Sequence, residues 1–357
     1  MSGRERPAEA LVEEVLAGKH RALARVITHV ENRTPGYRAI VGRLHTHATD
    51  THVIGITGSP GAGKSTLVDK MATRYRDRGL TVGIIAIDPS SPYTGGAVLG
   101  DRIRMASNVG DMDVFFRSMS ARGSLGGLST ATTDAITALD AFGKDRIIVE
   151  TVGAGQNEID IVRTADSVVV LVPPSSGDEV QMLKAGILEI GDLFAVNKAD
   201  LEGTDRTVME LEEMIMLRED NPTLDAGHHG ATSADPSGEP DDREGWEPPV
   251  LETVAETGAG VEDLLETLAD HRSWLDHSGM REQRARGRIA ETIRTLLRED
   301  ANGLVEAELE ALGGIGAVVD RIRAGETDPY TAVDRVFASL QGVEEAEPAS
   351  PADENAD

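Results

Sequence analysis

Residues 53–66 read Val-Ile-Gly-Ile-Thr-Gly-Ser-Pro-Gly-Ala-Gly-Lys-Ser-Thr, and this stretch decides the fold. Its first five residues are rich in β-branched side chains and predict a strand. The next eight match G-x-x-x-x-G-K-S, the pattern of a phosphate-binding loop. Leu67, Met71 and Tyr75 follow at helical spacing. A strand, a glycine-rich loop and a helix in this order are the context that the motif requires, so the stretch predicts a nucleotide-binding α/β domain rather than an ordinary glycine-rich turn.

The residues of this loop are expected to hold nucleotide phosphates. Glycines let backbone N–H groups turn inward around a phosphate, and the start of the following helix adds positive potential. Lys64 would supply a positive charge to the β- and γ-phosphates, and the Ser65 hydroxyl would be a ligand of Mg²⁺. The predicted nucleotide contacts in the loop are Gly58, Ser59, Pro60, Gly61, Ala62, Gly63, Lys64, Ser65 and Thr66.

Short apolar runs alternate with helical stretches on both sides of the loop. Nearly all are continuously apolar, as strands covered on both faces must be, which predicts a mostly parallel sheet flanked by helices. Besides residues 53–57, the predicted strands are 82–87, 114–116, 147–149, 168–172, 193–196 and 250–254.

The sequence pattern divides the chain into four segments. The predicted segments are a helical N-terminal part (1–51), with a possible break near Gly18, a nucleotide-binding domain (52–278), a C-terminal helical segment (279–341) and a disordered acidic tail (342–357). Residues 221–249 are rich in Asp, Glu, Gly and Pro, and predict a flexible insertion, because so little apolar surface cannot offset the entropy of ordering.

Asn197-Lys198-Ala199-Asp200 follows the run 193–196 and predicts the selectivity for the base. A carboxylate at Asp200 can accept hydrogen bonds from N1–H and the 2-amino group of guanine, whereas adenine offers neither donor. A site whose groups hydrogen-bond to specific donors of a ligand can favour that ligand over an analogue without those donors by roughly 10⁴-fold. The tetrapeptide alone would be a polar turn, but its place several strand–helix units after a phosphate loop favours GTP over ATP.

Two acidic residues end predicted strands between these motifs. Asp88 follows the run 82–87, and Glu150 follows 147–149 and begins Glu-Thr-Val-Gly153. Carboxylates at these ends face the crevice where such sheets bind ligands, and there they can orient Mg²⁺ and its waters. The backbone N–H of Gly153 can contact a γ-phosphate and lose it on hydrolysis. The alternative is that both acids are helix caps or ordinary strand-end residues.

Composition excludes several classes of protein. The 357 residues include 62 acidic and 35 basic ones, a formal net charge of −27, which predicts no nucleic-acid partner and no membrane surface. The absence of cysteine excludes disulfides and thiolate chemistry, and we find neither a signal peptide nor a membrane-spanning run. We expect a cytoplasmic protein. With only six lysines, the acidic excess favours adaptation to a salt-rich cytoplasm over a generic acidic surface.

Several linked motifs resemble the MeaB/ArgK family, the GTPases associated with methylmalonyl-CoA mutase. The resemblance covers roughly residues 8–340. The motifs are residues 88–92 (Asp-Pro-Ser-Ser-Pro), 94–105 (Thr-Gly-Gly-Ala-Val-Leu-Gly-Asp-Arg-Ile-Arg-Met), 122–127 (Arg-Gly-Ser-Leu-Gly-Gly), 150–156 (Glu-Thr-Val-Gly-Ala-Gly-Gln) and 177–179 (Gly-Asp-Glu).

The resemblance implies a P-loop GTPase that binds GTP, GDP and Mg²⁺. Residues 94–105 would be the first switch with Asp101 near the metal, 150–156 the second switch, and 173–184 a third mobile segment facing the partner. The family guards the loading of adenosylcobalamin onto the mutase and helps to eject damaged cofactor. Its members are homodimers through C-terminal helices, which matches the apolar helical pattern after residue 280.

The chain departs from the family pattern in the loop that contacts the base. Val254, Ala255 and Glu256 stand where the family usually has a small-residue turn with a serine, so only backbone contacts to guanine are expected there.

The residue that positions the attacking water is also not obvious. Signalling GTPases place glutamine directly after the second-switch glycine, but here that residue is Ala154, and Gln156 lies two residues later. We therefore expect slow intrinsic hydrolysis that the mutase accelerates. The candidates for the missing water-positioning and catalytic groups are Asp101, Gln156 and Lys184. Each of them could instead have no catalytic role.

Two other functions remain possible from the sequence. One is a metal-insertion GTPase of the same fold class, although such proteins need Cys/His clusters that this chain lacks. The other is an ATP-dependent kinase of periplasmic-binding-protein transport, against which Asn197 and Asp200 argue.

Overall fold

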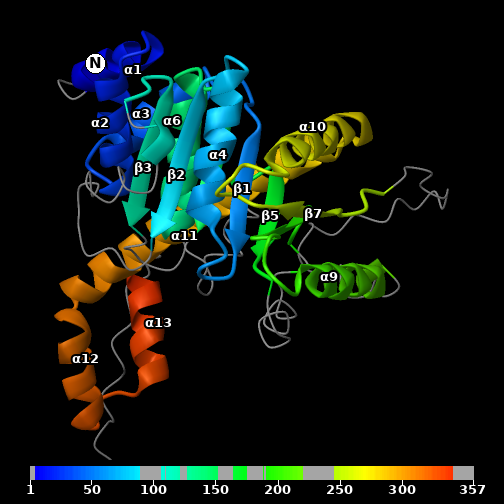
Figure 1. Cartoon of the computed structure of the whole chain (residues 1–357). Helices are drawn as coiled ribbons and strands as arrows, with labels where there is room; N and C mark the ends of the chain where they lie inside the picture. The colour runs from blue at the N-terminus through cyan, green and yellow to red at the C-terminus, as the bar shows by residue number, and fades with distance from the viewer. Residues whose placement is uncertain are drawn as a thin grey trace, which may run out of the picture. The chain divides into compact units, whose positions relative to one another are not determined.

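A parallel sheet forms the centre of the larger part of the molecule (Figure 1). The computed structural model describes residues 5–88, 106–108, 110–120, 127–151, 164–174, 188, 190–219 and 245–340. Its seven strands lie in the order β3-β2-β4-β1-β5-β6-β7, and every neighbouring pair is parallel. The strands are β1 (Val53–Gly58), β2 (Val82–Asp88), β3 (Val114–Ser120), β4 (Arg146–Thr151), β5 (Ser167–Val172), β6 (Leu193–Asn197) and β7 (Val250–Thr253).

The predicted fold class is confirmed, and its cause is visible in the burial of the strands. Every residue of β1, β5 and β6 is buried, as continuously apolar runs require when helices cover both faces of a sheet. The structure extends β3 four residues beyond the predicted end at residue 116. The sequence pattern missed this extension because Arg117 and Ser118 interrupt the apolar run.

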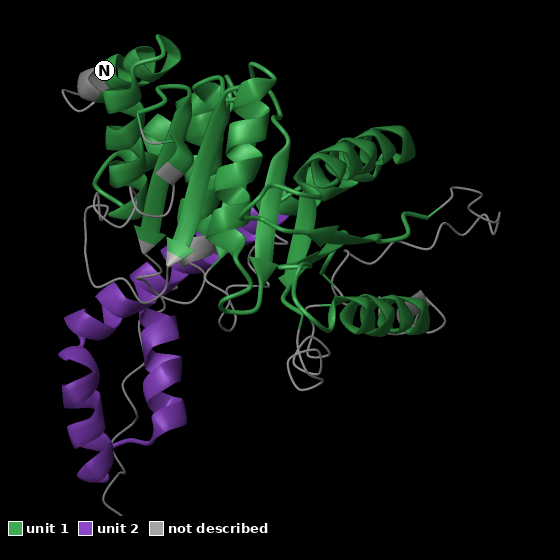
Figure 2. Ribbon diagram, in the orientation of Figure 1, with its two compact units in different colours: residues 1–288 green, residues 289–357 purple. Residues whose placement is uncertain are grey.

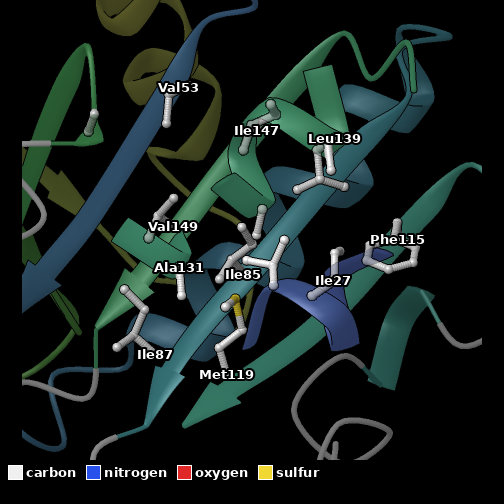
Figure 3. Close-up of a cluster of buried hydrophobic side chains, with 14 of the residues drawn as sticks. Ile27, Val53, Ile85, Ile87, Phe115, Met119, Ala131, Leu139, Ile147 and Val149 are labelled. Atoms are coloured by element: carbon white, nitrogen blue, oxygen red, sulfur yellow. The ribbon is translucent and has the colours of Figure 1, made fainter. Parts of the chain in front are cut away.

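Two apolar cores lie on opposite faces of the sheet. One joins the sheet to the N-terminal helices, α6 and α9, and Figure 3 shows part of it, with Ile27, Ile85 and Val149 among its members. The other joins the sheet to α4 and α10. The helices are α1 (Glu5–Leu16), α2 (His20–Glu31), α3 (Tyr37–His45), α4 (Lys64–Asp77), α6 (Gly127–Ala141), α9 (Thr204–Glu219) and α10 (Val261–Ser278), and a short 3₁₀ turn covers Ala106–Asn108.

The N-terminal helices break where the sequence predicts. Gly18 has a φ of 76°, a value that glycine adopts without strain, and it separates α1 from α2. Val15, Leu23 and Ile27 are fully buried in the core that these helices share with the sheet. The helices predicted for the N-terminal part and the break near Gly18 are therefore confirmed.

The chain divides into two compact units, residues 1–288 and 289–357 (Figure 2). The second unit contains most of α11 (Met280–Ala311), together with α12 (Gly314–Arg323) and α13 (Pro329–Leu340). Many of its apolar side chains are exposed, among them Ile293, Leu297, Tyr330 and Phe337. Within the described ranges, no helix is both long enough and apolar enough to cross a bilayer.

Most of the predicted insertion 221–249 and the whole tail 342–357 lie outside the described residues. The last five residues of the insertion, 245–249, are described, and Trp246 anchors them. Its indole Nε1 donates a hydrogen bond to the carbonyl oxygen of Asp192 at 2.7 Å, and its ring lies 4.7 Å from that of His271.

A buried polar cluster joins the amino ends of β1, β5 and β6 to α10. The Oγ of Ser167 lies 2.8 Å from Nε2 of His52 and 2.7 Å from Nδ1 of His271. Nε2 of His271 faces the Asp192 carboxylate at 3.5 Å. That carboxylate favours a proton on Nε2, so Nδ1 of His271 accepts from Ser167, and Ser167 in turn accepts from His52.

Arginines at the start of α11 neutralise the carboxylates of this region. Arg284 pairs with Asp192 at 2.9 Å, and Arg288 pairs with Asp166 at 2.8 Å. Burial alone would raise the pKa of Asp192, but the Arg284 charge and its hydrogen bonds bring it below its ordinary value. The two aspartates also accept backbone N–H groups, Asp166 from Val53 and Asp192 from Val168, and so hold the beginnings of β1 and β5.

We predict that acidification destabilises the fold through the two buried histidines. Burial lowers the pKa of His52 to about 3 and that of His271 to about 4, against an ordinary 6.5. Between pH 6.5 and 4 the unfolded chain therefore takes up protons that the folded chain does not. The free energy of unfolding should fall with decreasing pH, by up to about 1.4 kcal/mol per pH unit for each histidine.

Chemical denaturation at fixed salt, repeated between pH 7 and 4, measures this slope. His52→Gln keeps a donor at the place of Nε2 and does not titrate, so its slope should be shallower. His47→Gln changes an exposed histidine and should leave the slope unchanged. Equal slopes in His52→Gln and the unmodified protein would contradict the assignment.

Candidate nucleotide-binding site

The predicted phosphate loop joins the carboxyl end of β1 to the amino end of α4. Gly58 and Gly63 have φ values of 131° and 94°, which side chains rarely adopt. A Cβ on Gly58 would lie 2.0 Å from the carbonyl oxygen of Leu171, and one on Gly63 would lie 2.4 Å from Nδ2 of Asn197. Glycine is therefore required at both positions by the close approach of β5 and β6.

Lys64 is buried at the first turn of α4 and reaches back over the loop. Its Nζ donates hydrogen bonds to the carbonyl oxygens of Gly58 at 2.7 Å and Ser59 at 2.9 Å. The cation is thus held on the loop itself, beside the amino end of a helix. Both features attract an anion, so the loop is suited to a phosphate group.

Asn197 connects this loop to the segment that follows β7. Its Nδ2 donates to the carbonyl oxygen of Ala62 at 2.6 Å. Its Oδ1 accepts from the backbone N–H of Ala255 at 2.9 Å and from the Thr253 hydroxyl at 3.2 Å. The side chain is buried, and both ends of its amide bind the protein. Asn197 therefore fixes the phosphate loop and the predicted base loop relative to each other.

The sequence did not identify Thr253 as part of this connection. In the sequence, Thr253 is marked only as a polar residue near the end of the run 250–254.

The other residues of the predicted base site surround this connection. Lys198, with a φ of 64°, donates from Nζ to the carbonyl oxygen of Gly61 at 2.9 Å. Asp200 is exposed, two residues beyond. The N–H of Ala199 donates to the carbonyl oxygen of Thr253, which brings residues 197–200 beside 253–256. Val254 begins a tight turn, because its carbonyl oxygen accepts from the N–H groups of Thr257 and Gly258.

Ser65 and Glu150 form the part of the site that could hold a metal ion. The Ser65 hydroxyl donates to Oε1 of Glu150 at 2.5 Å. Glu150 is buried near the carboxyl end of β4 and is paired in register with Ile56 of β1. A hydroxyl and a carboxylate oxygen are hard donors of the kind that Mg²⁺ prefers, so these two residues fit it.

Further ligands of the metal ion would have to come from groups other than Ser65 and Glu150. Over the described ranges, no group of three or more His, Asp or Glu side chains is arranged to hold a metal. Mg²⁺ commonly completes its coordination with substrate phosphates and water.

Other predicted site residues fall wholly or partly outside the described residues. The backbone of Asp88 ends β2 beside β4, at the same sheet edge as Glu150, but its side chain is not described. Asp101, Gly153, Gln156 and Lys184 lie outside the described residues altogether, so their predicted roles stay predictions. Pro60, Thr66 and Glu256 lie in the described loop, the first turn of α4 and the turn after β7, respectively.

Comparisons with known proteins identify a family of GTPases. A family model described as "Methylmalonyl Co-A mutase-associated GTPase MeaB" matches residues 23–310. A Pyrococcus horikoshii protein, provisionally named a GTPase, is 44% identical over 337 residues, 94% of this chain and 99% of its own length. The Escherichia coli "GTPase ArgK" is 31% identical over 81% of this chain and 83% of its own.

A more distant relative and a solved structure extend the comparison. The Caenorhabditis elegans "Methylmalonic aciduria type A homolog, mitochondrial" is 27% identical over 94% of this chain and 83% of its own. A crystal structure titled "LAO/AO transport system kinase" has a TM-score of 0.65, 22% identity and coverage of 94% and 98% of the two chains. At that identity the structure supports the fold alone.

We predict that Asn197→Ala weakens both the fold and nucleotide binding. The change leaves the Ala62 carbonyl and the Ala255 N–H without their partner, and unsatisfied buried groups should lower the free energy of unfolding by about 3 kcal/mol. Urea denaturation measures the first effect and titration calorimetry with GDP the second. Asn32→Ala is the matched control, since Asn32 also donates to a backbone carbonyl but is exposed. An Asn197→Ala variant as stable as Asn32→Ala would contradict the proposed connection.

Proposed function

Because the chain belongs to the MeaB family of methylmalonyl-CoA mutase-associated GTPases, we propose that it binds and hydrolyses GTP. With this activity it would gate the loading of adenosylcobalamin onto methylmalonyl-CoA mutase, and it would protect or reactivate that enzyme. The family description names the mutase, and the name of the nematode relative points to the same metabolic step. A metal-insertion GTPase and an ATP-dependent transport kinase are the alternatives that the tests below can separate.

The observation that carries the proposal is the bridge made by Asn197. One buried amide binds the phosphate loop through Ala62 and the turn after β7 through Ala255. The two loops are thereby held at the same edge of the sheet, where a single nucleotide can contact both. Ligands of open parallel sheets bind at this carboxyl edge.

In this proposal the base is selected at residues 198–200 and 254–256. The exposed Asp200 carboxylate accepts the N1–H and 2-amino groups of guanine, and the backbone of 254–256 lies on the other side of the base. Adenine would leave the carboxylate without donors, which discriminates against ATP. The stem of Lys198, held by Gly61, flanks the same space.

Lys64 and the backbone of residues 58–66 would hold the phosphates. Ser65, Glu150, Asp88 and Asp101 are proposed to hold Mg²⁺. When bound, the ion neutralises phosphate charge and polarises the bond that is cleaved. Glu150 accepts a hydrogen bond from Ser65, so these two oxygen donors lie next to each other.

Hydrolysis is proposed to be slow until the partner binds. Ala154 stands where signalling GTPases have their water-positioning glutamine. Gly153 would contact the γ-phosphate. The candidates for completing the hydrolytic site, which the mutase would bring into position, are Gln156, Asp101 and Lys184. GTP would therefore be hydrolysed quickly only when the correct partner is bound.

The C-terminal segment is proposed to form a homodimer in the cytoplasm. Residues 279–341 include many exposed apolar side chains, such as Leu297 on α11, Val319 on α12 and Phe337 on α13. Exposed apolar surface on this scale is characteristic of an interface. We also propose that the net charge of −27 reflects a salt-rich cytoplasm.

We predict that the protein binds GTP and GDP at least about 100-fold more tightly than ATP. Asp200→Asn should weaken GTP binding about tenfold or more, because hydrogen bonds to a charged group are lost, and should leave ATP binding unchanged. Isothermal titration calorimetry measures all three affinities. Asp205→Asn, an exposed acid on the first turn of α9, is the matched control. Equal affinities for GTP and ATP would contradict guanine selection and favour the transport kinase.

We predict that saturating methylmalonyl-CoA mutase raises the single-turnover rate of GTP hydrolysis about tenfold or more. The expected cause is completion of a site that lacks its own water-positioning residue. Rapid-quench measurements with and without the mutase test this, with an unrelated acyl-CoA enzyme as control. A rate that the mutase leaves unchanged would contradict the proposed chaperone cycle, while leaving the GTPase assignment intact.

A further inference from the structure

The end of β4 is hydrogen-bonded to α4 on one face of the sheet and to β1 on the other. On the face covered by α4, Ser65 donates to Glu150. Side chains alternate between faces along a strand, so the next residue of β4, Thr151, points to the opposite face. There its Oγ1 donates to Oγ1 of Thr57 at 2.9 Å, and both threonines are fully buried. This is the face of the core drawn in Figure 3, two residues beyond Val149.

We propose that Thr57 and Thr151 are positioning residues of the GTPase, which set where the chain leaves β4 relative to the phosphate loop. The inference rests on the proposed function. Thr57 directly precedes Gly58, and Thr151 directly precedes the segment 152–156 that includes Gly153. The hydroxyl pair therefore joins the two strand ends that precede, in the sequence, the phosphate loop and the predicted second switch.

The distance between the two oxygens is the reason that a pair of hydroxyls is needed. Two oxygens that share a proton lie 2.9 Å apart, whereas carbon atoms in contact stay about 3.5–4.0 Å apart. A valine pair of the same shape would lack the shared proton, so its facing methyl groups would have to separate from each other within the backbone ladder. A displacement of about 1 Å in a reacting geometry can cost about 10²-fold in rate.

Stability and positioning can be separated by a set of isosteric variants. Thr151→Val alone removes the hydroxyl that donates to the buried Thr57 hydroxyl, and should lower the melting temperature. The double variant Thr57→Val/Thr151→Val removes both hydroxyls, and such paired replacements can be nearly neutral for stability. Thr151→Ser keeps the hydroxyl and should behave like the unmodified protein.

The experiment measures the melting temperature, the hydrolysis rate at saturating GTP, and the affinities for GDP and for a non-hydrolysable GTP analogue with Mg²⁺. We expect Thr151→Val and the double variant to lose about tenfold in rate and in analogue affinity, with GDP affinity within about twofold. The double variant should recover most of the melting temperature without recovering the rate. Thr137→Val, which removes a hydroxyl that binds a carbonyl within α6, is the control and should change none of the binding or rate values.

A double variant that recovers rate and melting temperature together would overturn the proposal, since the pair would then serve stability alone. So would a Thr151→Val protein with unchanged rate and analogue affinity. If the unmodified protein binds the analogue but does not hydrolyse GTP, the proposed function fails. The ratio of analogue to GDP affinity across the variants still decides the positioning role in that case.

Discussion

The carboxamide of Asn197 is the constraint on which the candidate site depends. It is buried, it makes three hydrogen bonds, and its partners come from three places in the sequence: residue 62, residue 253 and residue 255. A buried amide left unsatisfied costs about 1–3 kcal/mol for each lost partner, so the end of β6, the phosphate loop and the turn after β7 take up their positions together. Gly63 is part of the same constraint, because a Cβ there would collide with this amide.

The two edges of the sheet have contrasting chemistry. At the amino edge, Ser167 lies within hydrogen-bond distance of His52 and His271, His271 faces the Asp192 carboxylate, and an arginine of α11 pairs with that carboxylate. At the carboxyl edge, Lys64 and the pair of Ser65 and Glu150 lie beside the start of a helix, where the local potential attracts anions. The carboxylates of the first edge are paired within the protein and bind the beginnings of β1 and β5. The second presents charge and hard oxygen donors, and is the edge where open parallel sheets bind their ligands.

Much of this architecture could be predicted from the sequence. The strands, the parallel sheet and the helix break at Gly18 follow from the period of apolar residues, and the structure confirms them. The sequence also grouped Asn197 with the nucleotide contacts, although both ends of its amide bind the protein. The clusters around Ser167 and Thr57 could not be predicted, because their partners are 94–115 residues apart and no local pattern marks them. Trp246 was likewise missed, since acidic and Pro-rich neighbours hide a single anchoring side chain.

We propose that one guanine nucleotide spans the phosphate loop and the loops joined by Asn197. A crystal structure of the full chain with Mg²⁺ and a non-hydrolysable GTP analogue measures this most directly. We expect phosphate oxygens within hydrogen-bond distance of Lys64 and the guanine edge within hydrogen-bond distance of Asp200, with the Asn197 bonds retained. A base that lies away from residues 197–200, or triphosphate bound elsewhere on the molecule, would contradict it.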